Sequence, residues 1–498
     1  MFENHFFGLH PASRSEYAAA IAASAAALLD RAPARSYSGG SPAQLAGKLP
    51  EWKETGGTWA EATDDLRAVI TNSVAVYHPH TCAHLHCPVL IAALSAEVVL
   101  TALNQSMDSF DQAPAATLIE QQVCDWVTRL VGYAPDSAAA FTTGGTQSNY
   151  LGLLLARDRW VRDHWGVSVQ DDGLPPQALG RMKILCSEGA HFSVVKAAHQ
   201  LGLGSAAVVS VAVDAQARMI PAALASTIAK LQASDREVFA VVATAGTTDA
   251  GAVDPLAALA DLCRNHGIWL HVDGAWGSAL LLSKRHRKQL VGIELADSVS
   301  LDFHKGFYQS VSCAAFAVRQ AANFALIRHH ADYLNPEEHE DLGVPDLVTH
   351  SLLTTRRFDS LKLWLTLRVV GVELLGAMVE RTLELAAQVA DHIRECADLE
   401  LVCEPSFSSV LFRILPAAGE SGPDLEALHA ALPSELLHTG RGVIGFTKLR
   451  GRRVLKLTLL NPNVQAEDIT FLLDQTVAAA NGLRADGGHG EVAAVVAC

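Results

Sequence analysis

Six short apolar segments between residues 181 and 318 constrain the fold of this 498-residue chain more than any other feature. They span residues 183–186, 206–213, 238–244, 268–272, 298–302 and 314–318. Helical stretches such as 255–265 separate several of them. Strands that are apolar throughout and alternate with helices are typical of a mostly parallel sheet with helices on both faces. The sequence therefore predicts an α/β fold built on such a sheet.

Polar and ionisable residues follow four of these predicted strands, at the point where each strand ends. They are His191, Thr248, Asp273 and Lys305. Because ligands of parallel sheets bind at the carboxyl ends of the strands, we expect these side chains to share one site. Burial at a strand end favours the neutral, nucleophilic form of the Lys305 amine. Taken alone, this lysine is equally compatible with an ordinary strand-end loop.

A glycine-rich turn precedes the first of these strands. Residues 141–149 read Phe-Thr-Thr-Gly-Gly-Thr-Gln-Ser-Asn and open a predicted helix that runs through Arg157. Free backbone N–H groups and the helix dipole make such a turn an anion cradle. The segment lacks the Lys-Ser/Thr of a P-loop and the glycine spacing of a dinucleotide fold. The alternative is that it only caps the helix.

These parts together match the requirements of pyridoxal phosphate. Its phosphate needs N–H and hydroxyl donors, its aldehyde needs an amine, and its ring nitrogen needs a carboxylate. Asp273 and Lys305 are separated by 32 positions, which allows one helix and one strand between them. The sequence therefore predicts a pyridoxal-phosphate site at the carboxyl ends of the strands.

The motifs of this site resemble those of the group II pyridoxal-phosphate-dependent amino-acid decarboxylases. The matching segments are 143–149, 245–248 (Ala-Gly-Thr-Thr), 271–276 (His-Val-Asp-Gly-Ala-Trp), 302–305 (Asp-Phe-His-Lys) and 356–364 (Arg-Arg-Phe-Asp-Ser-Leu-Lys-Leu-Trp). The likeness covers nearly all of residues 75–475, in the order of the family. It is nearest to the siderophore-type branch that acts on lysine, ornithine or 2,4-diaminobutyrate. The resemblance implies the fold type I, aspartate-aminotransferase-like architecture of pyridoxal-phosphate-dependent transferases.

The resemblance also implies roles for individual residues. Lys305 would be the Schiff-base lysine, Asp273 the partner of the ring nitrogen and His191 the residue that stacks on the ring. Ala275 would line the other face of the ring. The remaining positions, around the phosphate and the Schiff base, are Gly145, Thr146, Thr248, Asp302 and His304. A carboxylate repels a phosphate, so we do not expect Asp302 to bind the phosphate directly.

The residue that protonates the substrate carbon is expected in a lid or at His191. Residues 320–357 are polar and irregular, and a connection of this length is usually functional or mobile. Tyr333 and His350 are the candidates on this lid, and either is equally compatible with a surface loop. Where the aromatic branch of the family has a lid tyrosine, this chain has Leu347.

Histidines upstream of the sheet are candidates for substrate contacts. Residues 77–88 hold four histidines and two cysteines, including His80, His84 and His86. Two prolines and the lack of a second ligand cluster disfavour a zinc site, so no metal is expected. Lys456 lies near the position where the glutamate-specific branch has an arginine, and a lysine lacks the bidentate fork of an arginine. Its alternative role is that of a structural strand lysine.

These observations predict a carboxy-lyase that converts an L-amino acid to its amine and CO2. The expected substrate is a diamino acid: 2,4-diaminobutyrate, lysine or ornithine. One alternative is an acidic substrate, namely glutamate, aspartate or cysteine sulfinate. A second is an aldehyde-forming or other pyridoxal-phosphate enzyme on the same scaffold. A third is a cofactor-free binding protein, which the intact Lys305, Asp273 and His191 disfavour.

The expected domain organisation follows the composition along the chain. Residues 1–85 form a helical segment with a poor core, and an apparent capping box at Ser13–Glu16 starts its first helix. Residues 86–360 form the large cofactor-binding domain, 361–480 a small α+β domain and 481–498 a flexible tail. Because the family is typically homodimeric, residues 1–85 are expected to pack on a partner subunit, with the active site at the interface.

Charge and cysteine content limit the partners and the compartment. The net charge of −15 argues against a nucleic-acid or anionic-membrane surface as the main partner. The nine cysteines are scattered and odd in number, which suits a reducing compartment. Acidic residues precede the apolar stretch at 18–29, which a signal peptide would not have. We therefore expect a cytoplasmic protein without membrane anchorage.

Overall fold

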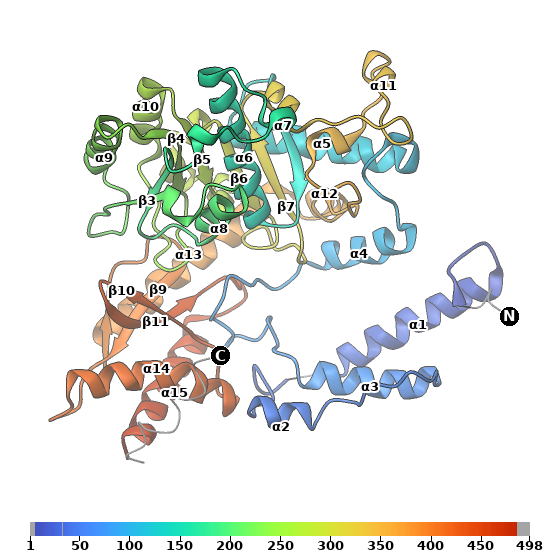
Figure 1. The fold of residues 1–498 in the computed structure, drawn as a ribbon. Helices are drawn as coiled ribbons and strands as arrows, with labels where there is room; N and C mark the ends of the chain where they lie inside the picture. Colours follow the sequence, from blue (N-terminus) through green and yellow to red (C-terminus); the bar gives the residue numbers. More distant parts are fainter. Residues whose placement is uncertain (1–4, 32, 486–498) are drawn as a thin grey trace. The chain divides into compact units, whose positions relative to one another are not determined.

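The structure, a computed structural model, describes residues 5–31 and 33–485. The chain divides into two compact units, whose elements are labelled in Figure 1. The large unit comprises Leu85–Ala386 and Glu404–Ser409. The small unit comprises Met1–His84, Ala387–Cys403 and Val410–Cys498.

A seven-stranded sheet forms the centre of the large unit. Its strands are β1 (Ala138–Thr142), β2 (Met182–Ser187), β3 (Val208–Val211), β4 (Glu237–Thr244), β5 (Trp269–Asp273), β6 (Ser298–Asp302) and β7 (Ala314–Val318), in the order β1-β7-β6-β5-β4-β2-β3. The five strands from β3 to β6 are parallel, whereas β7 is antiparallel to both of its neighbours. The predicted mostly parallel α/β sheet is confirmed. β1 was not predicted, because three of its five residues are alanine, which is depleted in strands.

Helices pack against this sheet along most of its width. The helices of the large unit are α4 (Ile91–Leu103), α5 (Pro114–Val131), α6 (Gly145–Trp165), α7 (Val169–Asp172), α8 (Ser193–Gln200), α9 (Pro221–Ala233), α10 (Leu256–His266), α11 (Glu338–Asp341), α12 (Ser360–Val369) and α13 (Gly371–Glu395). α6 contacts β4, β5, β6 and β7, and α5 contacts β1 and β7. Every residue of β5, β6 and β7 is buried, as expected for strands that are apolar throughout.

Gly371 separates α12 from α13. Its φ of +78° lies in the left-handed region that glycine adopts without strain. A Cβ built at this position would meet nothing within 4 Å, so the glycine is there for its backbone conformation rather than for a close approach. The chain therefore changes direction between α12 and α13, and the boundary between the two units falls within α13.

A four-stranded sheet organises the small unit. Its strands are β8 (Leu399–Leu401), β9 (Ser409–Ile414), β10 (Gly445–Leu449) and β11 (Arg452–Thr458), in the order β10-β11-β9-β8, with α14 (Gly422–His438) and α15 (Ala466–Ala485). The chain around Cys82 extends this unit, because its N–H donates to the carbonyl of Val443 at 2.8 Å. Its own carbonyl accepts from the N–H of Thr458 at 2.7 Å.

The N-terminal helices of the small unit are α1 (Pro11–Leu29), α2 (Pro42–Ala46) and α3 (Trp59–Thr71). The capping box expected at Ser13–Glu16 is wrong. α1 begins at Pro11, whose fixed φ suits the first helical position, and the Ser13 hydroxyl instead donates to the carbonyl of His10 at 2.9 Å. Capping boxes do start α2 at Ser41 and α3 at Thr58.

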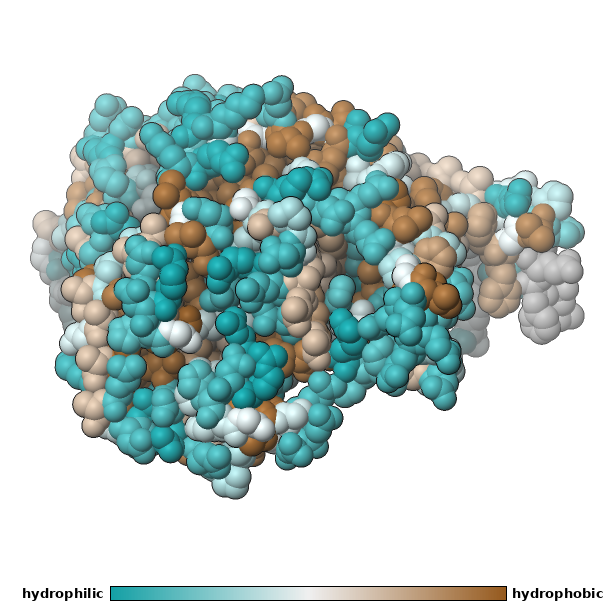
Figure 2. Space-filling model, turned by 90° about the horizontal axis from the view of Figure 1, so that it is seen from above, coloured by the Kyte–Doolittle hydropathy of each residue, from teal (hydrophilic) through white to brown (hydrophobic). Residues whose placement is uncertain are grey.

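At the other end of the chain, α15 continues to Ala485, so the first five residues of the predicted tail are helical. The rest of that tail lies outside the described residues. None of the helices in the described chain combines the length and the apolar run that crossing a lipid bilayer would require. The face seen in Figure 2 is largely hydrophilic, with hydrophobic side chains in separate groups.

Candidate active site

A cavity of about 300 Å³ lies in the large unit, at the carboxyl ends of its parallel strands. All eight residues predicted to bind the cofactor line it: Gly145, Thr146, His191, Thr248, Asp273, Ala275, His304 and Lys305. Asp302 and Asn149 also line the cavity. The structure therefore brings together the residues that follow separate strands in the sequence.

Lys305 lies in the turn that follows β6. Its Nζ atom is 2.9 Å from Oδ2 of Asp302, and its side chain retains 20% exposure toward the cavity. The second carboxylate oxygen of Asp302, Oδ1, is buried and has no hydrogen-bond partner among the residues that the structure describes. The amine is thus held at the cavity by a carboxylate that keeps one acceptor unused.

His304 is fixed by backbone contacts on both sides. Its Nδ1 atom lies 2.8 Å from the carbonyl oxygen of Cys313, and its own carbonyl accepts from the thiol of Cys87 at 3.4 Å. Nε2 is 3.6 Å from Oδ2 of Asp302. Burial lowers the pKa of His304, although the nearby Asp302 carboxylate opposes this effect. A neutral imidazole therefore stands beside the lysine.

Asp273 is the last residue of β5, and neutral donors hold its carboxylate. Oδ2 accepts from the Asn149 side-chain amide at 2.8 Å. Oδ1 accepts from the backbone N–H of Ala275 at 3.1 Å. Only 6% of Asp273 is exposed, so its charge is largely removed from water. A cationic group bound in the cavity would find this carboxylate already oriented.

His191 lies in the loop between β2 and α8. Its Nδ1 atom is 2.8 Å from the hydroxyl of Ser193, which also accepts from the Asn149 amide at 2.9 Å. Burial lowers the pKa of His191, with the Asp273 carboxylate opposing and the Lys305 ammonium adding to this shift. The imidazole is therefore neutral at neutral pH and presents an apolar, flat surface to the cavity.

The first turn of α6 forms the predicted anion cradle. The leading N–H groups of a helix have no acceptor within the helix, which leaves those of Gly145 and Thr146 available at the cavity. A Cβ at Gly145 would lie 2.8 Å from Cβ of Ala275, so only glycine fits there. The side chain of Gln147 is already occupied, because its Oε1 accepts from the N–H and the hydroxyl of Thr143.

The donor set of this cavity fits pyridoxal phosphate. The partly exposed Lys305 amine could react with the aldehyde of the cofactor, and the oriented Asp273 carboxylate could pair with its ring nitrogen. The N-terminus of α6 could bind its phosphate. The buried hydroxyl of Thr244, which also lines the cavity, has no hydrogen-bond partner among the described residues. Buried polar atoms of this kind are expected where a bound group completes the hydrogen bonding.

Other predicted residues do not line this cavity. His80, His84 and Lys456 belong to the small unit. Tyr333 is 88% exposed, and His350 is partly buried with its ring 4.6 Å from that of Phe324. Burial lowers the pKa of His350 to about 4, which makes it a poor acid at neutral pH. Of the lid candidates, Tyr333 is thus the more accessible.

The structure also adds residues that were not predicted from the sequence. Asn149 was read as part of the phosphate cradle, but its side chain points to Asp273 instead. Ser193 and His271 join the same network. The sequence contains only a weak indication of this network. His271 lies two residues before Asp273 on one strand, so the two side chains share a face of the sheet.

With this geometry established, comparisons with known proteins place the chain in context. A family model described as the pyridoxal-dependent decarboxylase conserved domain matches residues 42–415. The L-2,4-diaminobutyrate decarboxylase of Acinetobacter baumannii is 44% identical over 456 residues, which cover 90% of this chain and 89% of that protein. The acidic amino acid decarboxylase of Mus musculus is 31% identical over 85% of this chain and 78% of that protein.

Similarity to a solved structure extends over almost the whole chain. The crystal structure of the glutamate decarboxylase domain of diaminobutyrate-pyruvate transaminase and L-2,4-diaminobutyrate decarboxylase from Vibrio parahaemolyticus superposes with a TM-score of 0.87. The two sequences are 38% identical, and the match covers 97% of this chain and 99% of that one.

Proposed function

This chain belongs to the pyridoxal-dependent decarboxylase family, and from that premise we propose that its substrate is L-2,4-diaminobutyrate. The family confirms the prediction of an amino-acid decarboxylase that uses pyridoxal 5′-phosphate. One observation carries the substrate proposal: 44% identity to an L-2,4-diaminobutyrate decarboxylase over 90% of the chain. The products would be CO2 and propane-1,3-diamine.

The proposed roles at the cavity follow from its geometry. When bound, pyridoxal phosphate supplies an aldehyde that takes up the substrate amine and a ring that accepts the electrons left behind by CO2. Lys305 would hold the aldehyde, with Asp302 Oδ2 at 2.9 Å keeping the amine in place and able to exchange a proton with it. Asp273 would keep the proton on the ring nitrogen, and His191 would cover one ring face.

The phosphate would lie at the first turn of α6. The backbone N–H groups of Gly145 and Thr146 and the hydroxyl of Thr248 would donate to it, and the helix dipole would stabilise its charge. Ala275 would line the ring face opposite His191. Asp302 would face the lysine rather than the phosphate, since its carboxylate already pairs with the Lys305 ammonium.

The proton delivered to the substrate carbon would come from Tyr333 or His191. Tyr333 has the exposure that a lid residue needs to move onto a substrate. His191 lines the cavity itself and is held by Ser193. We propose Tyr333 as the donor, with His191 as the alternative. Tyr333→Phe would abolish amine formation without abolishing cofactor binding, whereas wild-type rates would assign the role to His191.

For the diamino acid, we propose that His80 and His84 contact the side-chain ammonium. Burial lowers the pKa of His80, which keeps this ring uncharged and able to accept a hydrogen bond. Lys456, only 6% exposed on β11, favours the alternative of an acidic substrate because a lysine attracts a distal carboxylate. The 31% identity to an acidic amino acid decarboxylase supports the same alternative.

Release of CO2 from a panel of amino acids tests the proposal. The panel contains 2,4-diaminobutyrate, ornithine, lysine, glutamate, aspartate and cysteine sulfinate, and the products are identified by mass. We expect the highest kcat/KM with 2,4-diaminobutyrate. A preference for an acidic substrate would establish the alternative, and release of aldehyde with ammonia would overturn decarboxylation as the main reaction.

We further propose that the protein is a cytoplasmic homodimer with its active site at the subunit interface. α4 exposes several large apolar side chains in the large unit, namely Ile91, Leu94, Val98, Val99 and Leu103. A contiguous apolar helix face of this kind is typical of a subunit interface. None of the eight cysteines that the structure describes is paired in a disulfide, which suits a reducing compartment.

Two measurements test this part of the proposal. Sedimentation of the full chain should give twice the mass of 53.0 kDa. Deleting residues 1–70 should give monomers or insoluble protein, because the N-terminal segment would pack on the partner subunit. A soluble, active dimer without these residues would contradict that role, and fractionation of cells would test the compartment.

A further inference from the structure

A continuous line of buried polar side chains runs along one face of the sheet of the large unit, next to α6, and ends at Asp273. Nε1 of Trp269 donates to Oγ of Ser298 at 2.9 Å, and this oxygen lies 2.8 Å from Nδ1 of His271. Nε2 of His271 is 2.9 Å from Oδ1 of Asn149, whose Nδ2 donates to Asp273 at 2.8 Å. The line crosses β5 from its first residue to its last.

The hydrogen atoms along this line have one consistent arrangement. Asp273 can only accept when ionised, so the nitrogen of the Asn149 amide must face it and the oxygen must face His271. His271 therefore carries its proton on Nε2, and its Nδ1 accepts from the hydroxyl of Ser298. The indole of Trp269 can only donate, which is consistent with the same direction. Every donor thus points toward Asp273.

Asn149 is the branch point of the network. Its oxygen accepts from His271 at 2.9 Å and from the hydroxyl of Ser300 at 2.7 Å. Its nitrogen donates to Asp273 and to Ser193. All four hydrogen-bonding positions of the amide are used, so it cannot rotate without losing bonds in a site where it is 1% exposed.

The bond from Asn149 to Ser193 determines which ring nitrogen of His191 carries the proton. Ser193 accepts from Asn149, so its own hydroxyl proton is directed at Nδ1 of His191, 2.8 Å away. The backbone N–H of Ser193 also donates to that nitrogen at 3.3 Å. Two donors on Nδ1 leave the proton of the neutral ring on Nε2.

The network carries no net charge of its own. Burial lowers the pKa of His271 to about 4, so the ring is neutral at neutral pH. A charged residue in this place would compete with the cofactor for Asp273, whereas aligned neutral dipoles stabilise the carboxylate and leave its charge available. Buried polar side chains on a sheet and on the helix that covers it would be costly without such complete hydrogen bonding.

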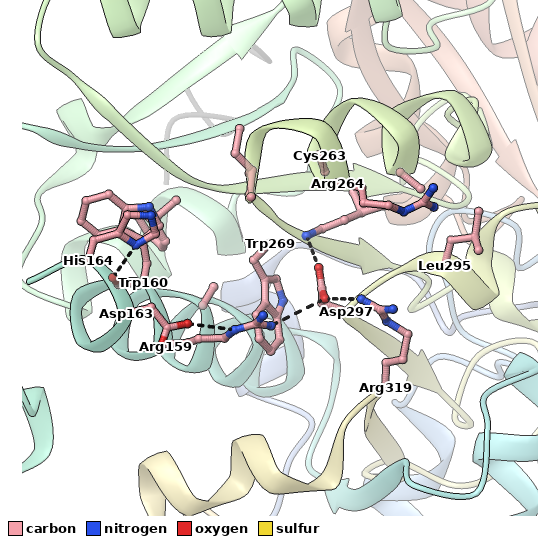
Figure 3. Close-up of a pocket in the computed structure, with 16 residues that line it drawn as sticks. Arg159, Trp160, Asp163, His164, Cys263, Arg264, Trp269, Leu295, Asp297 and Arg319 are labelled. Carbon is pink, nitrogen blue, oxygen red and sulfur yellow. Dashed lines mark hydrogen bonds and ion pairs between the residues drawn. The ribbon is translucent and has the colours of Figure 1, made fainter. Parts of the chain in front are cut away.

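We propose that Asn149, supported by His271, Ser298 and Trp269, is a positioning residue that orients the Asp273 carboxylate toward the cofactor ring nitrogen and sets the Nε2–H tautomer of His191. The proposal rests on the proposed function, because it assigns the network a task toward bound pyridoxal phosphate. Trp269 is the far end of the relay and lies beside Arg159 and Asp297 at the opposite edge of the sheet (Figure 3).

The test compares two cofactors on the full-length apoenzyme by fluorescence titration. Pyridoxal phosphate has the ring nitrogen, and its 1-deaza analogue has C–H in that place. Asn149→Leu keeps the branched shape and the number of heavy atoms and removes all four bonds. We expect its dissociation constant for pyridoxal phosphate to rise about tenfold, which corresponds to one lost charge-assisted hydrogen bond. The affinity for the deaza analogue should change less than about twofold, since that ring makes no bond to Asp273.

The rise in the dissociation constant should become smaller as the substituted residue lies farther from Asp273 along this line of hydrogen bonds. Ser298→Ala should raise the dissociation constant for pyridoxal phosphate by about threefold, and Trp269→Phe by less, because each bond polarises only its neighbour. Ser360→Ala is the matched control for Ser298→Ala. Both serines are fully buried, but the Ser360 hydroxyl has no hydrogen-bond partner within the described chain. We expect both cofactors to bind this control as they bind the wild type.

A spectroscopic measurement reports the ring nitrogen directly. With ¹⁵N-labelled pyridoxal phosphate, the ¹⁵N shift of the wild type should be that of a protonated nitrogen, and Asn149→Leu should move it toward the unprotonated value. Equal losses of affinity for both cofactors, or no loss for either, would overturn the proposed relay. Failure of the wild type to bind pyridoxal phosphate would instead refute the proposed function. If Asn149→Leu does not fold, the serine pair and Trp269→Phe decide the question.

Discussion

The two edges of the large sheet each carry a polar cavity, and the two cavities differ in how their charges are satisfied. The cavity at the carboxyl edge has a volume of about 300 Å³, and the one at the amino edge has about 240 Å³. Both contain ionisable side chains supplied by strand ends and neighbouring helices. Size and polarity therefore do not distinguish the cofactor site from the other cavity.

At the amino edge, the charged groups neutralise one another. Asp297 accepts from Arg319 at 2.7 Å and from the backbone N–H of Leu270 at 2.9 Å, and Arg159 lies 3.8 Å away (Figure 3). Arg159 also pairs with Asp163 at 3.5 Å. Oppositely charged partners this close leave little charge for a ligand, so this cavity is a structural ion-pair cluster.

At the carboxyl edge, charges and hydrogen-bonding atoms are left open. Asp273 is held by neutral donors, and Asp302 keeps Oδ1 without a partner within the described residues. Free N–H groups at the start of α6 add positive potential without a side chain. A cavity that combines an oriented carboxylate, a reactive amine and open backbone N–H groups can bind a ligand that uses all three, which is the physical basis for locating the cofactor here.

The largest expected effect comes from removing the amine at the carboxyl edge. Lys305→Ala should reduce decarboxylation by at least about a thousandfold, since it removes the nucleophile that holds the cofactor aldehyde. The visible absorbance band of enzyme mixed with pyridoxal phosphate should disappear. Lys183→Ala is the control near the amino ends of the strands, where that amine donates to the carbonyl of Ala206 at 3.0 Å. A Lys305→Ala enzyme with normal absorbance and rate would contradict the site.

A smaller effect is expected from removing the negative charge of Asp273 in the same cavity. Asp273→Asn keeps the shape and removes the charge that would stabilise a protonated ring nitrogen, so kcat should fall by about a hundredfold. The folded protein should retain its unfolding midpoint within a few degrees, measured by circular dichroism. Loss of stability without loss of kcat would mean that Asp273 belongs with the structural carboxylates such as Asp297.

His271, midway between the edges, should make stability depend on pH. Burial lowers its pKa from the usual 6.5 to about 4. The unfolded chain therefore binds this proton first, and the free energy of unfolding falls as the pH drops below 6.5 toward 4. At pH 5 this residue should account for a loss of about 2 kcal/mol relative to pH 7.5. Urea unfolding at both values should show that loss in the wild type and not in His271→Gln.

The smallest effect is expected at the amino edge. Asp297→Asn weakens two ion pairs and should lower the free energy of unfolding by about 1 kcal/mol, with kcat and KM unchanged. Arg264→Ala is its control, because the pair of that arginine with Asp261 is more than half exposed on both sides and contributes little. A fall in kcat for Asp297→Asn alone would show that the amino edge influences the catalytic site.

Much of this site was predictable because its key residues are marked by local patterns. Lys305, Asp273 and His191 each follow an apolar strand, and parallel strands place their carboxyl ends together. Gly145 was recognised from its motif, and the structure gives the reason: a Cβ there would meet Ala275 at 2.8 Å.

Other features were not predictable, and each has a physical reason. β1 has an alanine-rich sequence, and it is a strand because β7 pairs with it along its full length. The capping pattern at Ser13 was overridden by Pro11 two residues earlier. The residues of segment 320–357 carry no periodic pattern, and the exposure of Tyr333 and the partial burial of His350 beside Phe324 emerged only from tertiary packing.

The sequence by itself determined that the chain forms a mostly parallel sheet, which functional residues follow its strands, and which cofactor they suit. These are local properties, because they depend on the periodicity of each strand and on the residue types at its end. Only the tertiary structure decided where the Asn149 amide points. Its partner Asp273 is 124 positions away, and its partner Ser300 is 151 positions away. Hydrogen bonds over such separations depend on how β5, β6 and α6 pack together, and no local pattern encodes that packing.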